Sequence, residues 1–186
     1  MRRHEPMTAE AVEMLDPEPP ETILLANIRA AQAGDHRAFE NIMIATERRV
    51  ATLAWRILGD AEEVKEALQE TFMRLFRHLG KYDEGHDFTG WLYRIAVNVC
   101  RDLDKRRRRR AFFFGRIEET APPHTSMRID LARAIDRLPP KERLAIILRD
   151  VEELSTEEVA AILGNSPATV RVQISKAREK LRRWLS

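Results

Sequence analysis

The stretch LSTEEVAAILGNSPATVRVQISKAREKL, residues 154–181, predicts two short helices joined by a tight turn. Ser155, followed three residues later by Glu158, has the pattern of a capping box, in which each side chain bonds the backbone N–H of the other residue. Gly164 suits the left-handed residue that ends such a helix. Pro167 fits the first turn of the next helix, where its missing N–H is not needed. The capping residues therefore define both helices of the pair.

The second of these helices separates an apolar face from a polar one. Residues spaced by four, three and four positions share one side, and these are Val170, Ile174, Ala177 and Leu181. Basic and polar residues fall on the other faces, namely Arg171, Ser175, Lys176 and Arg178. This combination is typical of a helix-turn-helix, whose second helix enters the DNA major groove. An ordinary helical hairpin with a solvated basic face is the alternative.

Composition and charge narrow the class of protein. The 186 residues suffice for one domain or two small ones. The net charge of +2 averages segregated blocks, because 101–110 and 171–186 are basic whereas 60–70 and the N-terminal tail are acidic. Basic blocks indicate a polyanionic partner, and acidic blocks indicate a separate, basic protein partner.

The cysteine count and the hydropathy pattern exclude several classes. Cys100 is the single cysteine, so a disulfide framework and a cysteine-rich metal site are excluded, and its helical apolar context predicts a small core residue. No apolar run approaches the ~20 residues needed to span a bilayer. The start, MRRHEPMTAEAVEM, lacks the apolar core of a signal peptide. We therefore expect a cytoplasmic protein without membrane insertion, metal or cofactor.

Apolar residues recur at helical spacing along the whole chain and never alternate as in a strand, which predicts an all-α fold. Residues 1–21, acidic and rich in proline, are expected to form a disordered tail. Helical patterns fill 22–105 and 126–186, which predicts two small helical domains. Between them, 106–125 is predicted to be a flexible linker, because five consecutive arginines repel one another in a helix and a Pro-Pro pair follows. The aromatic run Phe112–Phe114 is unusual in a linker and is expected to dock on a domain or on a partner.

Helix starts and one buried stripe can be assigned in the first domain. Three aspartates precede helical patterns and are predicted N-caps: Asp35, Asp60 and Asp87. The helix after Asp60 is expected to use one apolar stripe, formed by Val64, Leu68, Phe72, Leu75, Phe76 and Leu79.

Three segments then combine into a recognisable pattern. They are LGDAEEVKEALQETFMRLFRHL (58–79), FTGWLYRIAVNVCRDLDKRRRR (88–109) and the stretch from LPPKER to AREKL (138–181). In this order they resemble a bacterial RNA polymerase sigma factor of the sigma-70 family, in its extracytoplasmic-function (ECF) group, over about residues 22–185. The resemblance implies that 22–105 is region 2, which binds the β′ clamp helices and melts the −10 element. It implies that 126–186 is region 4, which binds the β flap and reads the −35 element, and that the protein itself is no enzyme.

The resemblance also assigns residues in region 2. The polymerase clamp would contact the acidic helix through Glu63, Glu66, Gln69 and Glu70. An unstacked base needs a pocket that offers stacking and hydrogen bonds, and the loop before the WLYRIA helix would provide it, with Tyr82 as a stacking face and Asn98 as donor and acceptor. The implied −10 set is Tyr82, Asp83, His86, Asp87, Trp91, Arg94, Asn98, Arg101 and Lys105. The arginines at 106–110 would follow the DNA backbone.

In region 4 the implied DNA contacts lie on the helix that opens at Pro167. Arg171, Ser175 and Lys176 are the expected base readers, since Arg and Lys suit guanine O6 and N7. Phosphate contacts are expected from Thr169 and Arg178. The implied −35 set is Pro167, Ala168, Thr169, Arg171, Val172, Ser175, Lys176 and Arg178. Val172 offers only apolar contact, such as to a thymine methyl group.

An anti-sigma factor, which masks the polymerase-binding faces, is a further partner that the resemblance implies. A stand-alone helix-turn-helix regulator is the alternative function, but such proteins usually dimerise on two half-sites, and the WLYRIAVN helix would be unexplained. A nucleic-acid enzyme is a third hypothesis. The five histidines are scattered without metal-ligand spacing, and no phosphate-binding glycine loop is present.

Overall fold

The computed structural model describes residues 21–114 and 127–185. The described residues form helices joined by short turns, with no β-strand among them, which confirms the all-α prediction. They divide into two units, one up to Leu103 and one that begins at Asp104. Each unit is considered by itself below.

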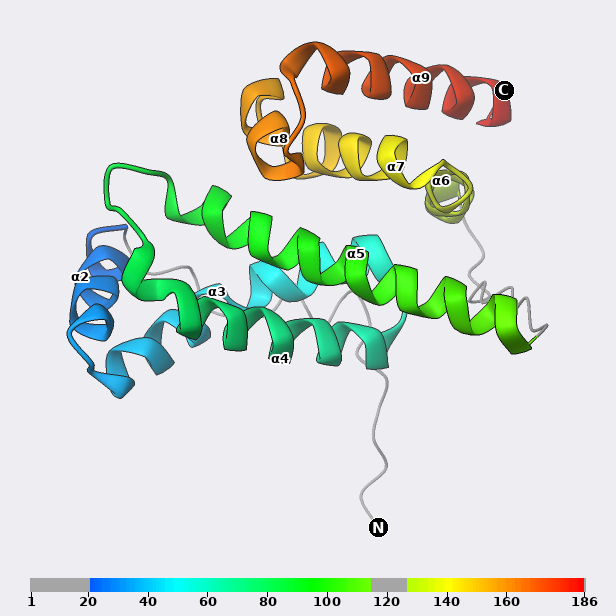
Figure 1. The fold of residues 1–186 in the computed structure, drawn as a ribbon. Coiled ribbons are helices and arrows are strands. Elements are labelled where there is room, and N and C mark those ends of the chain that lie inside the picture. The colour runs from blue at the N-terminus through cyan, green and yellow to red at the C-terminus, as the bar shows by residue number, and fades with distance from the viewer. Residues whose placement is uncertain (1–20, 115–126, 186) are drawn as a thin grey trace. The chain divides into compact units, whose positions relative to one another are not determined.

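The first unit contains α2 (Glu21–Gln32), α3 (His36–Leu58), α4 (Ala61–His78), the 3-10 turn η1 (Leu79–Lys81) and most of α5 (Phe88–Phe114). Figure 1 shows α4 and α5 as long helices, with α2 close to the loop that joins them. Its core consists of fully buried aliphatic side chains from each of the four helices, including Ile28, Ile42, Leu53, Leu75 and Leu92.

The predicted N-caps of the first unit are confirmed. Asp35 accepts hydrogen bonds from the backbone N–H groups of Arg37 and Ala38, and Asp60 accepts one from Glu63. Asp87 accepts bonds from the backbone of Thr89 and Gly90, at 3.0 and 2.7 Å. These carboxylates satisfy N–H groups that the first turn of a helix leaves without a partner. The three chain reversals of this unit are therefore fixed locally.

One residue of the predicted stripe of α4 is exposed. Phe76 is 52% exposed, whereas its neighbour Leu75 is fully buried. At about 100° per residue, Phe76 falls at the outer edge of the stripe whose buried members on α4 are Val64, Phe72 and Leu75. The Phe76 ring instead lies on the surface beside Phe39, with ring centroids 5.0 Å apart. The prediction that Phe76 belongs to the core was therefore wrong.

The helix α5 extends through the arginine run to Phe114, whereas the sequence pattern placed the start of the linker at residue 106. Asp104 pairs with Arg107 at 2.8 Å and with Arg108 at 2.9 Å. These i,i+3 and i,i+4 pairs offset part of the repulsion among the arginines. The remainder of the predicted linker, 115–125, and the acidic tail up to residue 20 lie outside the described residues.

The second unit contains α6 (Met127–Asp136), α7 (Pro140–Ile146), the π-helical turn η2 (Ile147–Val151), α8 (Thr156–Leu163) and α9 (Pro167–Leu185). In Figure 1, α9 lies along α7, and α8 connects them at one end. The apolar stripe of α9 is buried as predicted, at Val170, Ile174, Ala177 and Leu181.

The two helices of the helix-turn-helix begin and end as the sequence predicts. Ser155 Oγ accepts a bond from the Glu158 backbone N–H at 3.2 Å, and Glu158 Oε2 accepts one from the Ser155 N–H at 2.6 Å. Gly164 ends α8 in the left-handed region, at φ +65°. The entry into α8 was not predicted from the sequence. The π-helical turn η2 and Glu153, at φ +58°, together turn the chain out of α7. A left-handed non-glycine residue costs about 1–2 kcal/mol, which the surrounding packing must offset.

Candidate nucleic-acid interface

The predicted −35 residues of the second unit share the outer side of α9. Val170 and Ile174 hold the opposite side in the core. Exposed side chains then line the outer surface, and these are Ala168, Thr169, Arg171, Val172, Ser175, Lys176 and Arg178, with Pro167 half-buried. The helix start is fixed by Ser166, whose Oγ accepts a bond from the Thr169 backbone N–H at 3.2 Å. The structure thus presents these side chains on one continuous exposed face of a single helix.

The cations on this face differ in their partners. Arg178 donates two hydrogen bonds to Asp150 of η2, at 2.9 and 2.6 Å, and these bonds raise its pKa. Arg171 pairs with Glu157 of α8 at 3.2 Å. Lys176 forms no ion pair with any residue that the structure describes. Lys176 is therefore ready for a new acceptor, whereas a DNA phosphate would have to compete with Asp150 for Arg178.

A shallow hollow of about 800 Å³ lies between the first turn of α7 and the outer side of α9. Val172, which is 53% exposed, and Lys176 both line it. Lys141, which is not among the predicted −35 residues, lines it from α7 and adds a second lysine. Its position after a Pro-Pro pair at a helix start was the only signal, and spacing along the chain does not link it to α9.

In the first unit, the predicted stacking residue is not available as a stacking face. Tyr82 is only 7% exposed, because its ring packs against Phe88 and Trp91, each at a centroid distance of 5.3 Å. Its hydroxyl donates a hydrogen bond to the backbone oxygen of His86 at 2.6 Å. In this structure the Tyr82 ring therefore supports the loop from within and presents no open face. Trp91 remains half-buried in the same cluster.

The rest of the loop divides into braced and exposed residues. The Asp87 carboxylate is used to cap α5, as described above. Asp83 and His86 are exposed at the loop surface, and their side chains approach to 3.5 Å. Asp83 Oδ1 also accepts a hydrogen bond from the backbone N–H of Gly85 at 3.1 Å, so the loop uses part of this carboxylate while both side chains stay exposed to solvent.

Two residues of α2 hold this loop, and neither was predicted from the sequence. Gln32 Nε2 donates hydrogen bonds to the backbone oxygens of Leu79 and Tyr82, each at 2.9 Å. Arg29 forms a two-point ion pair with Glu84 in the loop. The hydrogen bond from Arg29 holds the pKa of Glu84 below its usual value. No periodic pattern links residues that are about fifty positions apart, so only the folded chain shows these contacts.

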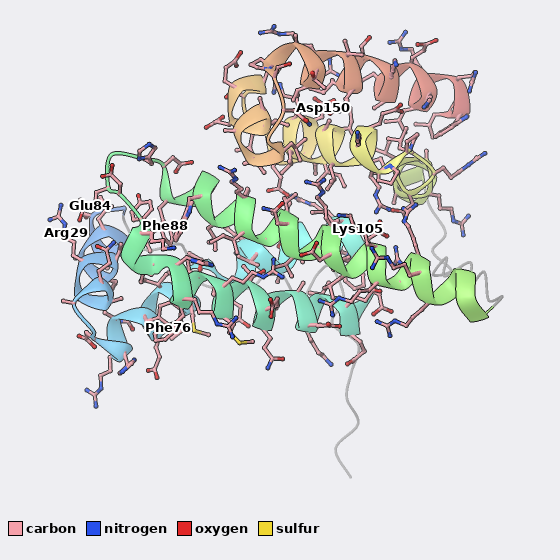
Figure 2. The ribbon with its side chains drawn as sticks, in the orientation of Figure 1. Arg29, Phe76, Glu84, Phe88, Lys105 and Asp150 are labelled. Carbon is pink, nitrogen blue, oxygen red and sulfur yellow. The ribbon has the colours of Figure 1, made fainter. Side chains whose placement is uncertain are left out.

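The remaining predicted −10 residues follow one face of α5. Arg94, Asn98, Arg101 and Lys105 are spaced by four, three and four positions. Arg94, Asn98 and Lys105 are exposed and Arg101 is half-buried. The face therefore places one amide among cations, beginning near the loop and continuing along the helix. Figure 2 labels Lys105 on this helix and Phe88 at its start.

The predicted polymerase-binding residues lie on α4. Glu66 and Gln69 are exposed, and Glu63 and Glu70 are half-buried. Glu70 accepts a hydrogen bond from Arg74 at 2.7 Å, and Arg74 also reaches Asp102 of α5 at 3.3 Å. The hydrogen bond to Glu70 raises the pKa of Arg74. One end of the acidic surface is thus joined to α5 through a single arginine.

The two described ranges contain no group of three or more His, Cys, Asp or Glu residues placed to hold a metal ion. No helix among the described residues has the length and apolar character needed to cross a membrane. Cys100 is fully buried, which confirms its prediction as a core residue, and burial raises the pKa of its thiol to about 12.

Comparison with known proteins gives matches to both units. The Sigma-70 region 2 family model matches residues 43–111, and the Sigma-70, region 4 model matches residues 128–181. The ECF RNA polymerase sigma factor SigE of Mycolicibacterium smegmatis is 37% identical over 74% of this chain and 58% of its own length. The ECF RNA polymerase sigma-E factor of Escherichia coli K12 is 31% identical over 83% of this chain and 90% of its own. A solved structure of CnrH in complex with the cytosolic domain of CnrY is similar with a TM-score of 0.67 and 27% identity, over 88% of this chain and 97% of that one.

Proposed function

This chain belongs to the extracytoplasmic-function group of the sigma-70 family, and we propose that it binds core RNA polymerase and directs it to specific promoters. In this proposal it reads the −35 and −10 elements and helps to melt the −10 region. The observation that carries the proposal is the match to region 2 over residues 43–111, followed by the match to region 4 over residues 128–181. The chemistry of transcription stays with the polymerase, so the chain itself acts without catalysis. In this proposal it acts in the bacterial cytoplasm, where promoter DNA and polymerase are found.

In the first unit we propose that α4 binds the polymerase and that the loop and α5 handle the −10 element. The exposed carboxylate of Glu66 and the amide of Gln69 are suited to a basic protein surface. Asn98 offers both a donor and an acceptor to the edge of an unstacked base. Arg94 and Lys105, on the same face of α5, would bind phosphates and give salt-dependent affinity.

In the second unit we propose that α9 enters the major groove at the −35 element. Lys176 and Arg171 would donate to guanine edges, and Ser175 lies between them on the same exposed side. Val172 would contact apolar groups such as a thymine methyl group. A single small module of this kind makes few contacts, so its isolated affinity is modest. Joint binding through the polymerase therefore supplies the selectivity of the complete complex.

We further propose that an anti-sigma factor controls this chain by covering its polymerase-binding faces. The support is the likeness to CnrH, which was solved in complex with the cytosolic domain of CnrY. A stand-alone helix-turn-helix regulator is less well supported, because region 2 would then have no role in a chain whose first unit matches it.

Transcription in vitro tests the proposal. The full chain is combined with core polymerase of its own bacterium and a genomic promoter library, and transcript starts are sequenced. We expect discrete start sites with shared −35 and −10 elements, and weak binding of the same promoters by the free chain. Starts that are scattered as with core polymerase alone would contradict the proposal. A DNA-binding homodimer that does not co-purify with polymerase would favour the stand-alone regulator instead.

A further inference from the structure

We infer that α2 acts as a brace for residues 82–87, called here the base-capture loop, and that Arg29 and Gln32 are positioning residues for −10 recognition. This inference rests on the proposed function of that loop. The region 2 family model matches from residue 43 onward, so α2 lies before the matched segment. Figure 2 shows Arg29 on α2 beside Glu84 of the loop.

Gln32 determines how the chain enters the base-capture loop. Its side-chain amide donates to two backbone oxygens, those of Leu79 in η1 and Tyr82 at the loop start, each at 2.9 Å. The Tyr82 N–H also bonds the Leu79 oxygen at 3.0 Å. One amide group thus joins both sides of this turn to α2. A side chain without donors leaves the oxygen of Tyr82 free to rotate, and with it the loop that follows.

Arg29 fixes the outer part of the loop. Two guanidinium N–H groups engage the two carboxylate oxygens of Glu84, with 2.7 Å between Nε and Oε1. A two-point pair of this kind restricts orientation as well as distance, because the guanidinium fork is planar and rigid. The pair is solvent-exposed, so its contribution to global stability is small. Its effect is therefore expected in the shape of the loop and not in folding.

The brace works only if α2 is itself fixed, and the packing shows that it is. Ile28 is fully buried beside α3, and Asn27 Oδ1 accepts a hydrogen bond from Asn41 of α3 at 3.2 Å. From within, the hydroxyl of Tyr82 holds the oxygen of His86. The loop is thus held at its start, its outer part and its end. Such pre-organisation lowers the ordering cost of capturing a base.

The experiment compares four variants in the full chain with core polymerase: Gln32→Leu, Arg29→Glu, Glu84→Arg and the double exchange Arg29→Glu with Glu84→Arg. Arg37→Glu is the matched control, since Arg37 is an exposed arginine outside the proposed interface. Transcription is measured on templates randomised at the −10 element and, separately, at the −35 element. Core-polymerase affinity and thermal unfolding are measured on the same preparations.

We expect Gln32→Leu to reduce −10 base selectivity and open-complex formation about tenfold, because two hydrogen bonds each contribute a few-fold to such an equilibrium. Each single charge reversal should reduce them a few-fold, and the double exchange should restore most of the loss. In all of these variants, the −35 preference, the polymerase affinity and the unfolding temperature should match those of the wild type. The control Arg37→Glu should match the wild type in every measurement.

Full −10 selectivity in Gln32→Leu and Arg29→Glu would overturn the brace. So would an equal loss at the −35 element or in polymerase affinity, since α2 would then serve only the fold. If Gln32→Leu does not fold, the charge exchange still tests the inference. A double exchange that does not restore −10 selectivity would overturn the role of the Arg29–Glu84 ion pair. A wild-type chain without promoter-specific transcripts would instead overturn the proposed function itself.

Discussion

Single side chains on the outer face of α9 differ in how freely they can bind DNA. Arg178 already donates two hydrogen bonds to Asp150, and Arg171 pairs with Glu157. Lys176 has no such partner among the described residues, so its binding to a base edge requires no ion pair to break. At the residue scale, Lys176 is therefore the cation from which direct −35 selectivity is expected.

Replacement of Lys176 by alanine is expected to weaken selection at one −35 position by about 1–3 kcal/mol, the typical contribution of a specific base contact. Transcription from templates randomised at the −35 element measures this effect. Arg182→Ala is a suitable control, because Arg182 is an exposed cation on the same helix outside the predicted base readers. An unchanged −35 preference in Lys176→Ala would place the base reader elsewhere.

Burial also determines the chemistry of the single cysteine. The thiol of Cys100 lies in the core of the first unit, and burial raises its pKa to about 12. Because the thiolate is the reactive form, we expect no measurable alkylation by iodoacetamide in the native protein at pH 8. Rapid alkylation should appear in urea, as mass spectrometry can follow. Fast labelling of the native chain would show that this part of α5 opens readily.

At the scale of single elements, the capping box determines where α8 begins and how α9 is presented. Ser155→Ala removes the hydroxyl that accepts the Glu158 N–H, and typical N-cap losses are about 1 kcal/mol. We expect chemical denaturation of the second unit to show a loss of this size. Ser175→Ala, at an exposed position in the middle of α9, serves as the control and should leave stability nearly unchanged.

The same element has a predictable pH dependence. The hydroxyl and the backbone N–H of Ser155 both hold the pKa of Glu158 below its usual value. A lowered folded pKa means that the stabilisation is present above the pKa of the unfolded chain and is lost as the pH falls through the folded value. We therefore expect the difference in stability between the wild type and Glu158→Gln to shrink below about pH 4. A difference that stays constant from pH 7 to pH 3 would contradict the role of the Glu158 carboxylate.

At the scale of the whole molecule, recognition is divided between two units with separate cores. Asn98 lies on α5 and Lys176 on α9, and the division of the chain falls between them. Substitutions at sites that share no partners usually add in free energy within about 0.3–0.5 kcal/mol. We therefore expect Asn98→Ala to slow melting, Lys176→Ala to weaken closed-complex binding, and the double variant to show the sum of the two. Kinetic measurements of closed and open complexes would test this, and a strongly non-additive double variant would show that the two sites act as one.

Features that depend on neighbouring residues were predicted correctly from the sequence. Caps at Asp35, Asp60, Asp87 and Ser155, the buried stripe of α9 and the core position of Cys100 follow from local hydrogen bonding and helical periodicity. The motifs of regions 2 and 4 were also readable in order. The same local logic failed for the arginine run, because the pairs of Asp104 with Arg107 and Arg108 were not weighed against charge repulsion.

Contacts between distant segments determine which side chains are exposed and which are held, and these contacts could not be predicted from the sequence. The tertiary structure placed Tyr82 beneath its loop, engaged Arg178 with Asp150, and brought Arg29 and Gln32 of α2 to a loop about fifty residues further along. Periodicity assigns a residue to a face of its own helix, but it carries no information on which distant segment packs there. The helices of this chain could therefore be predicted from the sequence, whereas the shape and support of its base-capture loop depend on packing between α2, η1 and the start of α5.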